Sequence, residues 1–60
     1  MFDPQTLINF RKRKKFSQAQ VARMMHVSQI SVYNWEHGIK RPNEKNYHRL
    51  RNLFWMSDIK

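Results

Sequence analysis

The hydrophobic residues of this chain recur every three or four positions. Val21 and Met25 lie four residues apart, and Val32 and Trp35 lie three apart. These spacings place side chains on one face of an α-helix, whereas a half-buried strand would alternate every second residue. The pattern therefore predicts an all-α fold with helices at about residues 4–14, 18–25, 29–37 and 44–55.

Residues that favour helix N-termini precede each of these segments. Ser17 opens the sequence Ser-Gln-Ala-Gln, in which Gln20 stands at the third helical position and completes a capping box. Pro4 stands at a first helical position, where its missing N–H costs nothing. The short polar side chains expected to cap the four helices are Asp3, Ser17, Ser28 and Asn43.

Larger apolar residues flank three of the caps in the positions of a hydrophobic staple. The pairs are Phe2 and Leu7, Phe16 and Val21, and Val27 and Val32. Only residues 26–28 separate the second and third helices, and such a short link forces a sharp angle between them. This arrangement is the helix-turn-helix unit. We expect one domain over residues 1–60, with the helix-turn-helix at about 18–37.

The third predicted helix divides into two unlike faces at 100° per residue. Val32 and Trp35 lie on one side with Ser31 and Glu36, and we expect this side to face the core. Amides can bind adenine in the major groove, and an aliphatic side chain can contact the thymine methyl. The opposite arc carries side chains of these kinds: Gln29, Ile30, Tyr33, Asn34 and His37. The alternative is that this arc is an ordinary solvated face with one stray Ile.

The charge of the chain favours DNA reading over an ordinary solvated face. Twelve Lys and Arg against four Asp and Glu give a net charge of +8, which predicts a polyanionic partner, nucleic acid above all. The basic run at 11–15 is either a solvated face or an end that faces phosphate. There is no Cys, hence no disulfide and no thiolate metal site. No apolar run is long enough to span a membrane, so we expect a cytoplasmic protein.

Rival functions fit the residues less well. The four acidic residues are scattered, no nucleophile motif or phosphate-cradling Gly loop is present, and the three His lack metal-ligand spacing. We therefore expect no enzyme, no metal and no cofactor. A membrane-surface helix would pair basic residues with a broad apolar face, which the amide-rich arc does not provide. Single-strand binding needs free aromatic rings, and most of the aromatic residues here occupy core or staple positions.

The last predicted helix carries more apolar residues than one face can hold. Tyr47, Leu50 and Phe54 share a face, while Leu53, Trp55 and Met56 fall outside it. An exposed apolar group on a small protein favours association with a second copy. The alternative is a chain end that folds back over Trp55.

The run SQAQVARMMHVSQISVYNWEHGIKRP resembles the helix-turn-helix of the Cro/repressor (Xre-type) DNA-binding family. The shared features are Ser-Gln at the start of helix two, Val21–Ala22, Val-Ser before helix three, and Glu-x-Gly followed by a basic residue and Pro. The resemblance covers about residues 4–54. It implies a compact four- to five-helix, lambda-repressor-like domain in which helix three enters the major groove.

The resemblance also implies roles for individual residues. Gln29, Ile30 and Asn34 would read bases, with Tyr33 and His37 placed for bases or adjacent phosphates. Arg11 and Glu36 would form an internal ion pair. Phosphate contacts are expected from Gln18, Ser28, Ser31, Lys40 and Arg41. The dimer contact departs from the one usual in the family: because of the apolar residues at the end of the last helix, we expect it from Leu53, Trp55, Met56 and Ile59. Two departures stand out, because His26 and Lys15 occupy link positions where the family usually has Gly.

The expected function is sequence-specific transcriptional regulation on double-stranded DNA. The small size is typical of a Cro-like repressor of phage, prophage or plasmid origin that binds an inverted repeat as a homodimer. An antitoxin-type autoregulator and a partner-binding DNA adaptor are the alternatives. We expect no small-molecule effector, no membrane association, and a location in the bacterial cytoplasm or an infected host cell.

Overall fold

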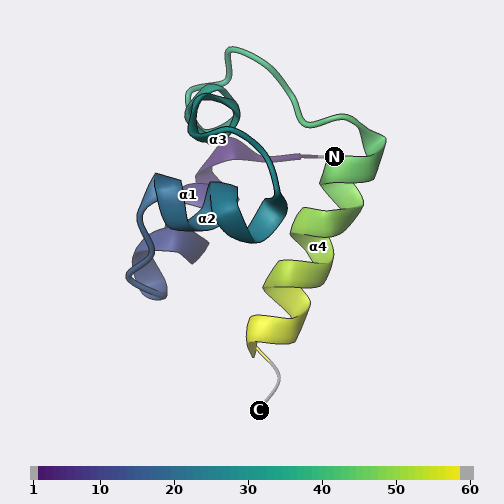
Figure 1. The fold of residues 1–60 in the computed structure, drawn as a ribbon. Coiled ribbons are helices and arrows are strands. Elements are labelled where there is room, and N and C mark those ends of the chain that lie inside the picture. The colour runs from purple at the N-terminus through teal and green to yellow at the C-terminus, as the bar shows by residue number, and fades with distance from the viewer. Residues whose placement is uncertain (1, 59–60) are drawn as a thin grey trace.

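The computed structural model describes the backbone of residues 2–58 and the side chains of residues 2–55. Its helices are α1 (Pro4–Arg13), α2 (Gln18–Met25), α3 (Gln29–Glu36) and α4 (Glu44–Asp58). All four predicted helices are confirmed, α4 being longer than expected, and no strand occurs within residues 2–58. In Figure 1, α3 is seen along its axis while α2 lies across the view, so the two helices point in different directions. The all-α helix-turn-helix fold is thus confirmed.

The cap residues act as predicted. Ser17 Oγ accepts the backbone N–H of Gln20 at 3.0 Å, and the Ser17 N–H donates to Gln20 Oε1 at 2.7 Å, which completes the capping box. The side-chain oxygens of the other three caps accept backbone N–H groups two or three residues later, at 3.1 Å for Asp3, 3.4 Å for Ser28 and 2.8 Å for Asn43. Each helix therefore begins at a residue that its own sequence specifies.

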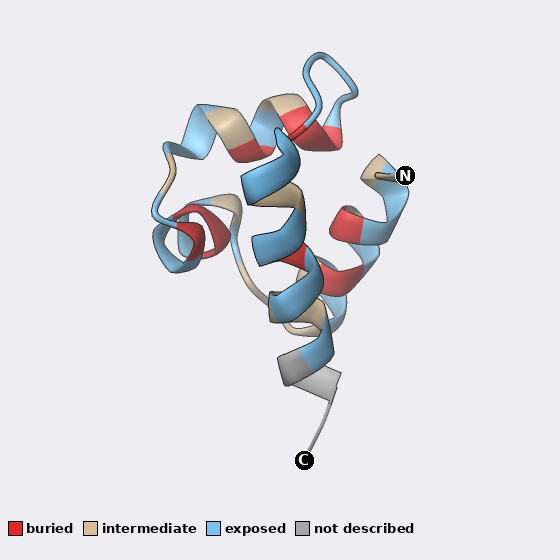
Figure 2. Cartoon of the chain, turned by 90° about the vertical axis from the view of Figure 1, so that its right-hand side faces the viewer, coloured by how far each residue is buried: buried red, intermediate tan, exposed pale blue. Residues whose placement is uncertain are grey.

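The core receives a fully buried aliphatic side chain from each helix. Leu7, Val21, Val32 and Leu50 are at most 1% exposed. The first three are the inner members of the predicted staples, and their outer partners Phe2, Phe16 and Val27 pack against the same cluster. One apolar pair at each of these helix starts thus both orients the helix and fills the core. Figure 2 shows the buried residues, in red, where the four helices meet.

Aromatic side chains attach α4 to α1. The ring of Phe10 lies 4.6 Å from that of Phe54 and 6.2 Å from that of Phe16, centroid to centroid. Leu53, expected outside the buried stripe, instead packs partly against the core, because it stands one turn after Leu50. Trp55 is 68% exposed. The side chain of Met56 and the whole of Ile59 lie outside the described residues.

The links on both sides of α2 have left-handed backbone. Lys15, between α1 and α2, has φ 60°, and His26, between α2 and α3, has φ 59° and ψ 41°. These are the two positions at which the family resemblance favours Gly. The His26 conformation ends α2 and lets the N–H of Val27 donate back to the carbonyl of Ala22 at 3.0 Å. In the part of the chain described here, no helix is long and apolar enough to cross a membrane.

Candidate nucleic-acid interface

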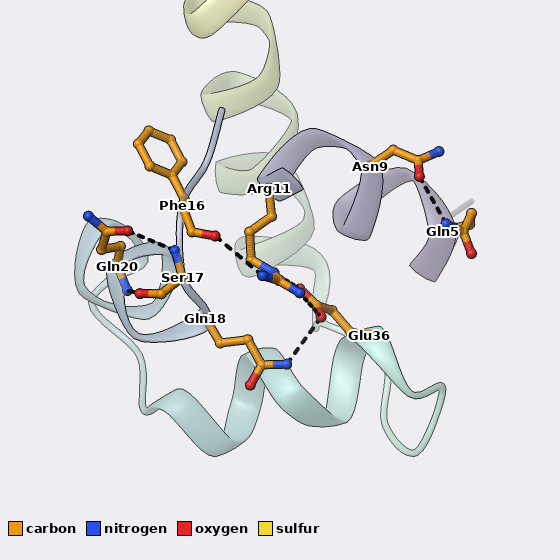
Figure 3. A network of polar contacts seen from close by, with 8 residues as sticks. All are labelled: Gln5, Asn9, Arg11, Phe16, Ser17, Gln18, Gln20 and Glu36. Atoms are coloured by element: carbon orange, nitrogen blue, oxygen red, sulfur yellow. Dashed lines mark hydrogen bonds and ion pairs between the residues drawn. The ribbon is translucent and has the colours of Figure 1, made fainter. Parts of the chain in front are cut away.

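The carboxylate of Glu36, at the end of α3, holds three parts of the fold together (Figure 3). Arg11 of α1 donates to it twice, from Nε to Oε2 at 2.6 Å and from a terminal nitrogen to Oε1 at 2.9 Å. Gln18, the first residue of α2, donates its Nε2 to the same Oε1 at 3.1 Å. The other terminal nitrogen of Arg11 donates to the carbonyl of Phe16 in the α1–α2 link at 3.3 Å.

The network is nearly closed to water. The Glu36 side chain is 3% exposed and that of Arg11 is 17% exposed. Burial alone raises the pKa of Glu36, but the hydrogen bonds from Arg11 and Gln18 and the charge of Arg11 outweigh it, so the pKa lies below its ordinary value. The hydrogen bond to Glu36 likewise raises the pKa of Arg11. Glu36 is therefore a charged scaffold group, held by the forked geometry that only a guanidinium offers.

The opposite side of α3 faces outward. Ile30 is 67% exposed and Tyr33 is 44% exposed. Gln29 and His37 are also exposed, while Asn34 is half-buried. We call these five residues the reading face. Val32, Trp35 and Glu36 are buried on the other side, which confirms the two faces of the helical wheel for these residues. Ser31 and Asn34, predicted on opposite faces, are both half-buried.

A shallow groove of about 420 Å³ lies at one edge of the reading face. It is lined by Gln29, Ile30 and Tyr33 of α3 and by Gln18 of α2. The amide of Gln18, which was expected to contact phosphate, therefore borders the reading face while one of its hydrogens is held by Glu36. Its Nε2 has a second hydrogen with which it can still donate to a phosphate.

The ring of Tyr33 packs against a neighbour one helical turn away. The rings of Tyr33 and His37 stack with centroids 4.0 Å apart and planes 28° apart. Residues four apart lie on the same helix face, which allows this contact. The stack favours one orientation of the Tyr33 ring beside the groove.

The candidate phosphate contacts lie at the two ends of α3. Ser28 caps the helix, and its Oγ lies 3.1 Å from the Oγ of Ser31. Lys40 and Arg41 are exposed in the α3–α4 link. That link is tied to α3, because the backbone N–H groups of Ile39 and Lys40 both donate to the carbonyl of Asn34, at 2.9 and 3.4 Å. The two basic side chains therefore start from a fixed point beside the reading face.

The described residues were also compared with the donor sets that bind metal ions. No group of three or more His, Asp or Glu side chains that could hold a metal ion occurs there. Each buried polar side-chain atom in this part of the chain has a hydrogen-bond partner. The polar groups that face inward thus serve the scaffold, and those free to bind a partner lie on the surface.

Comparison with known proteins identifies the class to which this fold and surface belong. The chain matches the model of the helix-turn-helix family, of the Xre/Cro type, over residues 7–54, and it therefore belongs to that family. Members of the family are DNA-binding transcription regulators. Comparison with curated proteins and with solved structures gave no match.

Sequence reasoning missed the hydrogen bond between Gln18 and Glu36. The two residues are 18 positions apart, and no local pattern joins them. It also missed the stack of Tyr33 on His37, although the spacing of four within a helix could have suggested it. Both contacts limit the freedom of side chains at the edge of the reading face.

We predict that Arg11→Ala lowers the free energy of unfolding by about 3–5 kcal/mol, because it leaves the buried Glu36 carboxylate without its charged partner. Urea unfolding followed by circular dichroism measures the loss. Lys12→Ala removes an exposed positive charge from the same helix and should change stability by only about 0.5 kcal/mol. Equal effects of the two substitutions would show that the ion pair does not hold the fold.

The lowered pKa of Glu36 predicts a loss of stability in acid. The folded state holds this carboxylate ionised to lower pH than the unfolded state does, so its contribution is complete above about pH 4.3 and disappears as the pH falls through the lower folded pKa. Urea unfolding at a series of pH values should show a steeper acid loss for the native chain than for Glu36→Gln. Glu44→Gln, which leaves the network intact, should keep the steep loss. Parallel curves for the native chain and Glu36→Gln would contradict the assignment.

Proposed function

We propose that this chain is a sequence-specific transcriptional regulator that binds double-stranded DNA at an inverted repeat as a homodimer. In its simplest form it is a Cro-like repressor of phage, prophage or plasmid origin, acting in the bacterial cytoplasm or an infected host cell. The observation that supports this most is the reading face: mixed amide, aromatic and aliphatic side chains exposed on α3, whose other side is buried in the core.

The chemistry of the reading face suits the edges of base pairs. Gln29 and Asn34 carry amides that can donate and accept together, the pattern that adenine N6 and N7 require. Ile30, 67% exposed, offers an apolar surface for a thymine methyl. An isolated exposed Ile would be ordinary on any protein. Beside two amides and a stacked Tyr ring, Ile30 would form part of a surface that can distinguish bases.

Affinity would come from the positive charge. With a net charge of +8, the chain would release counterions from DNA as its basic residues approach phosphates. Lys40 and Arg41 from the α3–α4 link, Gln18 at the start of α2, and Ser28 and Ser31 at the start of α3 would fix the register of the domain. The network around Glu36 would keep these groups at constant distances from the reading face.

We further propose that the homodimer forms through the end of α4. Trp55 is 68% exposed there, and Leu53, Met56 and Ile59 are its expected companions. A two-fold dimer of this kind would place its two reading faces about 34 Å apart, one turn of DNA. The operator would then contain two inverted half-sites at that separation.

Titration of the protein with duplex and single-stranded DNA over a range of salt tests the function. We expect the protein to select particular duplexes from a random library, with log K falling against log salt with a slope of roughly −6 to −10 for a dimer. Fluorescence anisotropy measures the binding. Tighter binding to single strands than to any duplex would refute the proposal.

Gln29→Ala tests the assignment of the reading face. It should weaken binding to the selected duplex by about 1–3 kcal/mol and relax the preference at one base position in each half-site. Selection from the random library with the variant protein measures both effects. Gln5→Ala, which removes an exposed amide from α1, should leave affinity and preference unchanged. A loss that is the same for every sequence would make Gln29 a phosphate contact.

A further inference from the structure

We propose that the shallow groove at the edge of the reading face is a binding site for the C5-methyl group of a pyrimidine base, through which the protein detects methylation of cytosine in its operator. This site rests on the proposed DNA-binding function and adds a ligand and a form of regulation to it. The groove, of about 420 Å³, is lined by Gln18, Gln29, Ile30 and Tyr33.

The groove lies where the starts of two helices meet. Gln18 is the first residue of α2, and Gln29 and Ile30 are the first two residues of α3. Tyr33 follows Ile30 by three positions, so the two side chains are neighbours on the helix surface. In helix-turn-helix proteins the N-terminal residues of this helix contact base edges. The groove would therefore face bases rather than the sugar–phosphate backbone.

The groove exposes apolar side chains that do not belong to the core. Ile30 is 67% exposed and Tyr33 is 44% exposed. The core instead receives Val32 and Trp35 from the same helix. Apolar surface in water gains free energy when another apolar group covers it. The groove therefore favours a ligand that has an apolar group of its own.

Two of the side chains that line the groove have partners outside it. Gln18 donates its Nε2 to Glu36 at 3.1 Å, as Figure 3 shows. Tyr33 stacks on His37 with ring centroids 4.0 Å apart. Side chains that already have partners lose less freedom when a ligand arrives, which lowers the cost of binding. The groove is thus suited to detecting a group as small as a methyl.

The base edges in the major groove of DNA offer one apolar group, the C5-methyl of thymine. The groups that identify the other bases there are nitrogen and oxygen atoms that donate or accept hydrogen bonds. Cytosine carries hydrogen at C5, and 5-methylcytosine carries a methyl group at the same ring position as thymine. A groove that receives the thymine methyl would therefore also receive that of 5-methylcytosine, and would distinguish this base from unmodified cytosine.

The amides and the apolar side chains of the groove would respond to different properties of a base pair. Gln29 can form hydrogen bonds with base edges, and these depend on whether the pair is T·A or C·G. Ile30 and Tyr33 would contact the methyl group, which is present or absent within either pair. The methyl contact is therefore isolated by comparing duplexes that differ in that group alone: T·A with U·A, and 5-methylcytosine·G with C·G.

The test uses a fluorescent duplex that the native chain selects from the random library. Each thymine of one half-site is replaced in turn by uracil, and cytosine and 5-methylcytosine are then compared at the position that responds. Fluorescence anisotropy measures the affinities. In both comparisons we expect the duplex without the methyl group to bind about three- to fivefold more weakly, the effect of burying one methyl group. Ile30→Ala, which removes most of the apolar side chain from the groove, should reduce both ratios to about one.

Ile39→Ala is the matched control. Ile39 is 60% exposed in the α3–α4 link and is not among the residues that line the groove, so its truncation should leave both ratios unchanged. Both variants shorten an exposed Ile and should melt within about 4 °C of the native chain. A difference between them would therefore come from the groove and not from stability.

The outcomes separate the methyl site from the proposed function. If the native chain selects a duplex and no uracil substitution weakens binding, the methyl site is refuted while the function stands. If uracil weakens binding but cytosine and 5-methylcytosine bind equally, the detection of cytosine methylation is refuted. If Ile30→Ala keeps the ratios, or Ile39→Ala loses them, the groove is not the site. If the native chain binds no duplex at any salt concentration, the function and the methyl site both fall.

Discussion

The hydrogen-bonded ion pair between Arg11 and Glu36 is the contact on which the rest of this structure depends. A carboxylate that is 3% exposed is stable only if its lone pairs are satisfied, and here Arg11 and Gln18 supply the donors. These donors come from α1 and α2, while the acceptor belongs to α3. The electrostatic requirement of one side chain thereby fixes three helices relative to one another, in a domain whose apolar core is small.

This polar contact has a consequence that apolar packing alone would not give. Hydrophobic contacts are not directional and tolerate small shifts of one helix over another, whereas a forked guanidinium–carboxylate pair has one geometry. Glu36 lies on the last turn of α3 and Val32 one turn earlier, so the helix is held along its length. Its rotation is then set, and with it the direction in which the side chains of the reading face point.

Much of the fold follows from local sequence, and for that reason it was predictable. The caps at Ser17 and Ser28 and their staples act within five residues, and all reappear in the structure. The bond from Gln18 to Glu36 and the partial burial of Leu53 depend on how distant segments pack, which periodicity does not encode. The reading face was predictable by elimination: it consists of the α3 residues that remain once the buried residues are assigned.

The positive charge that suits DNA also works against a compact fold, because like charges repel one another. The distribution of the basic residues along the helices reduces this repulsion. Arg11, Lys12 and Arg13 occupy the last turn of α1, where the helix dipole stabilises cations, and Arg23 does so in α2. Arg11 is in addition neutralised by Glu36. The basic residues at the end of α1 thus stand where the free chain tolerates them best. A single placement can therefore serve both the stability of the free domain and its attraction to DNA.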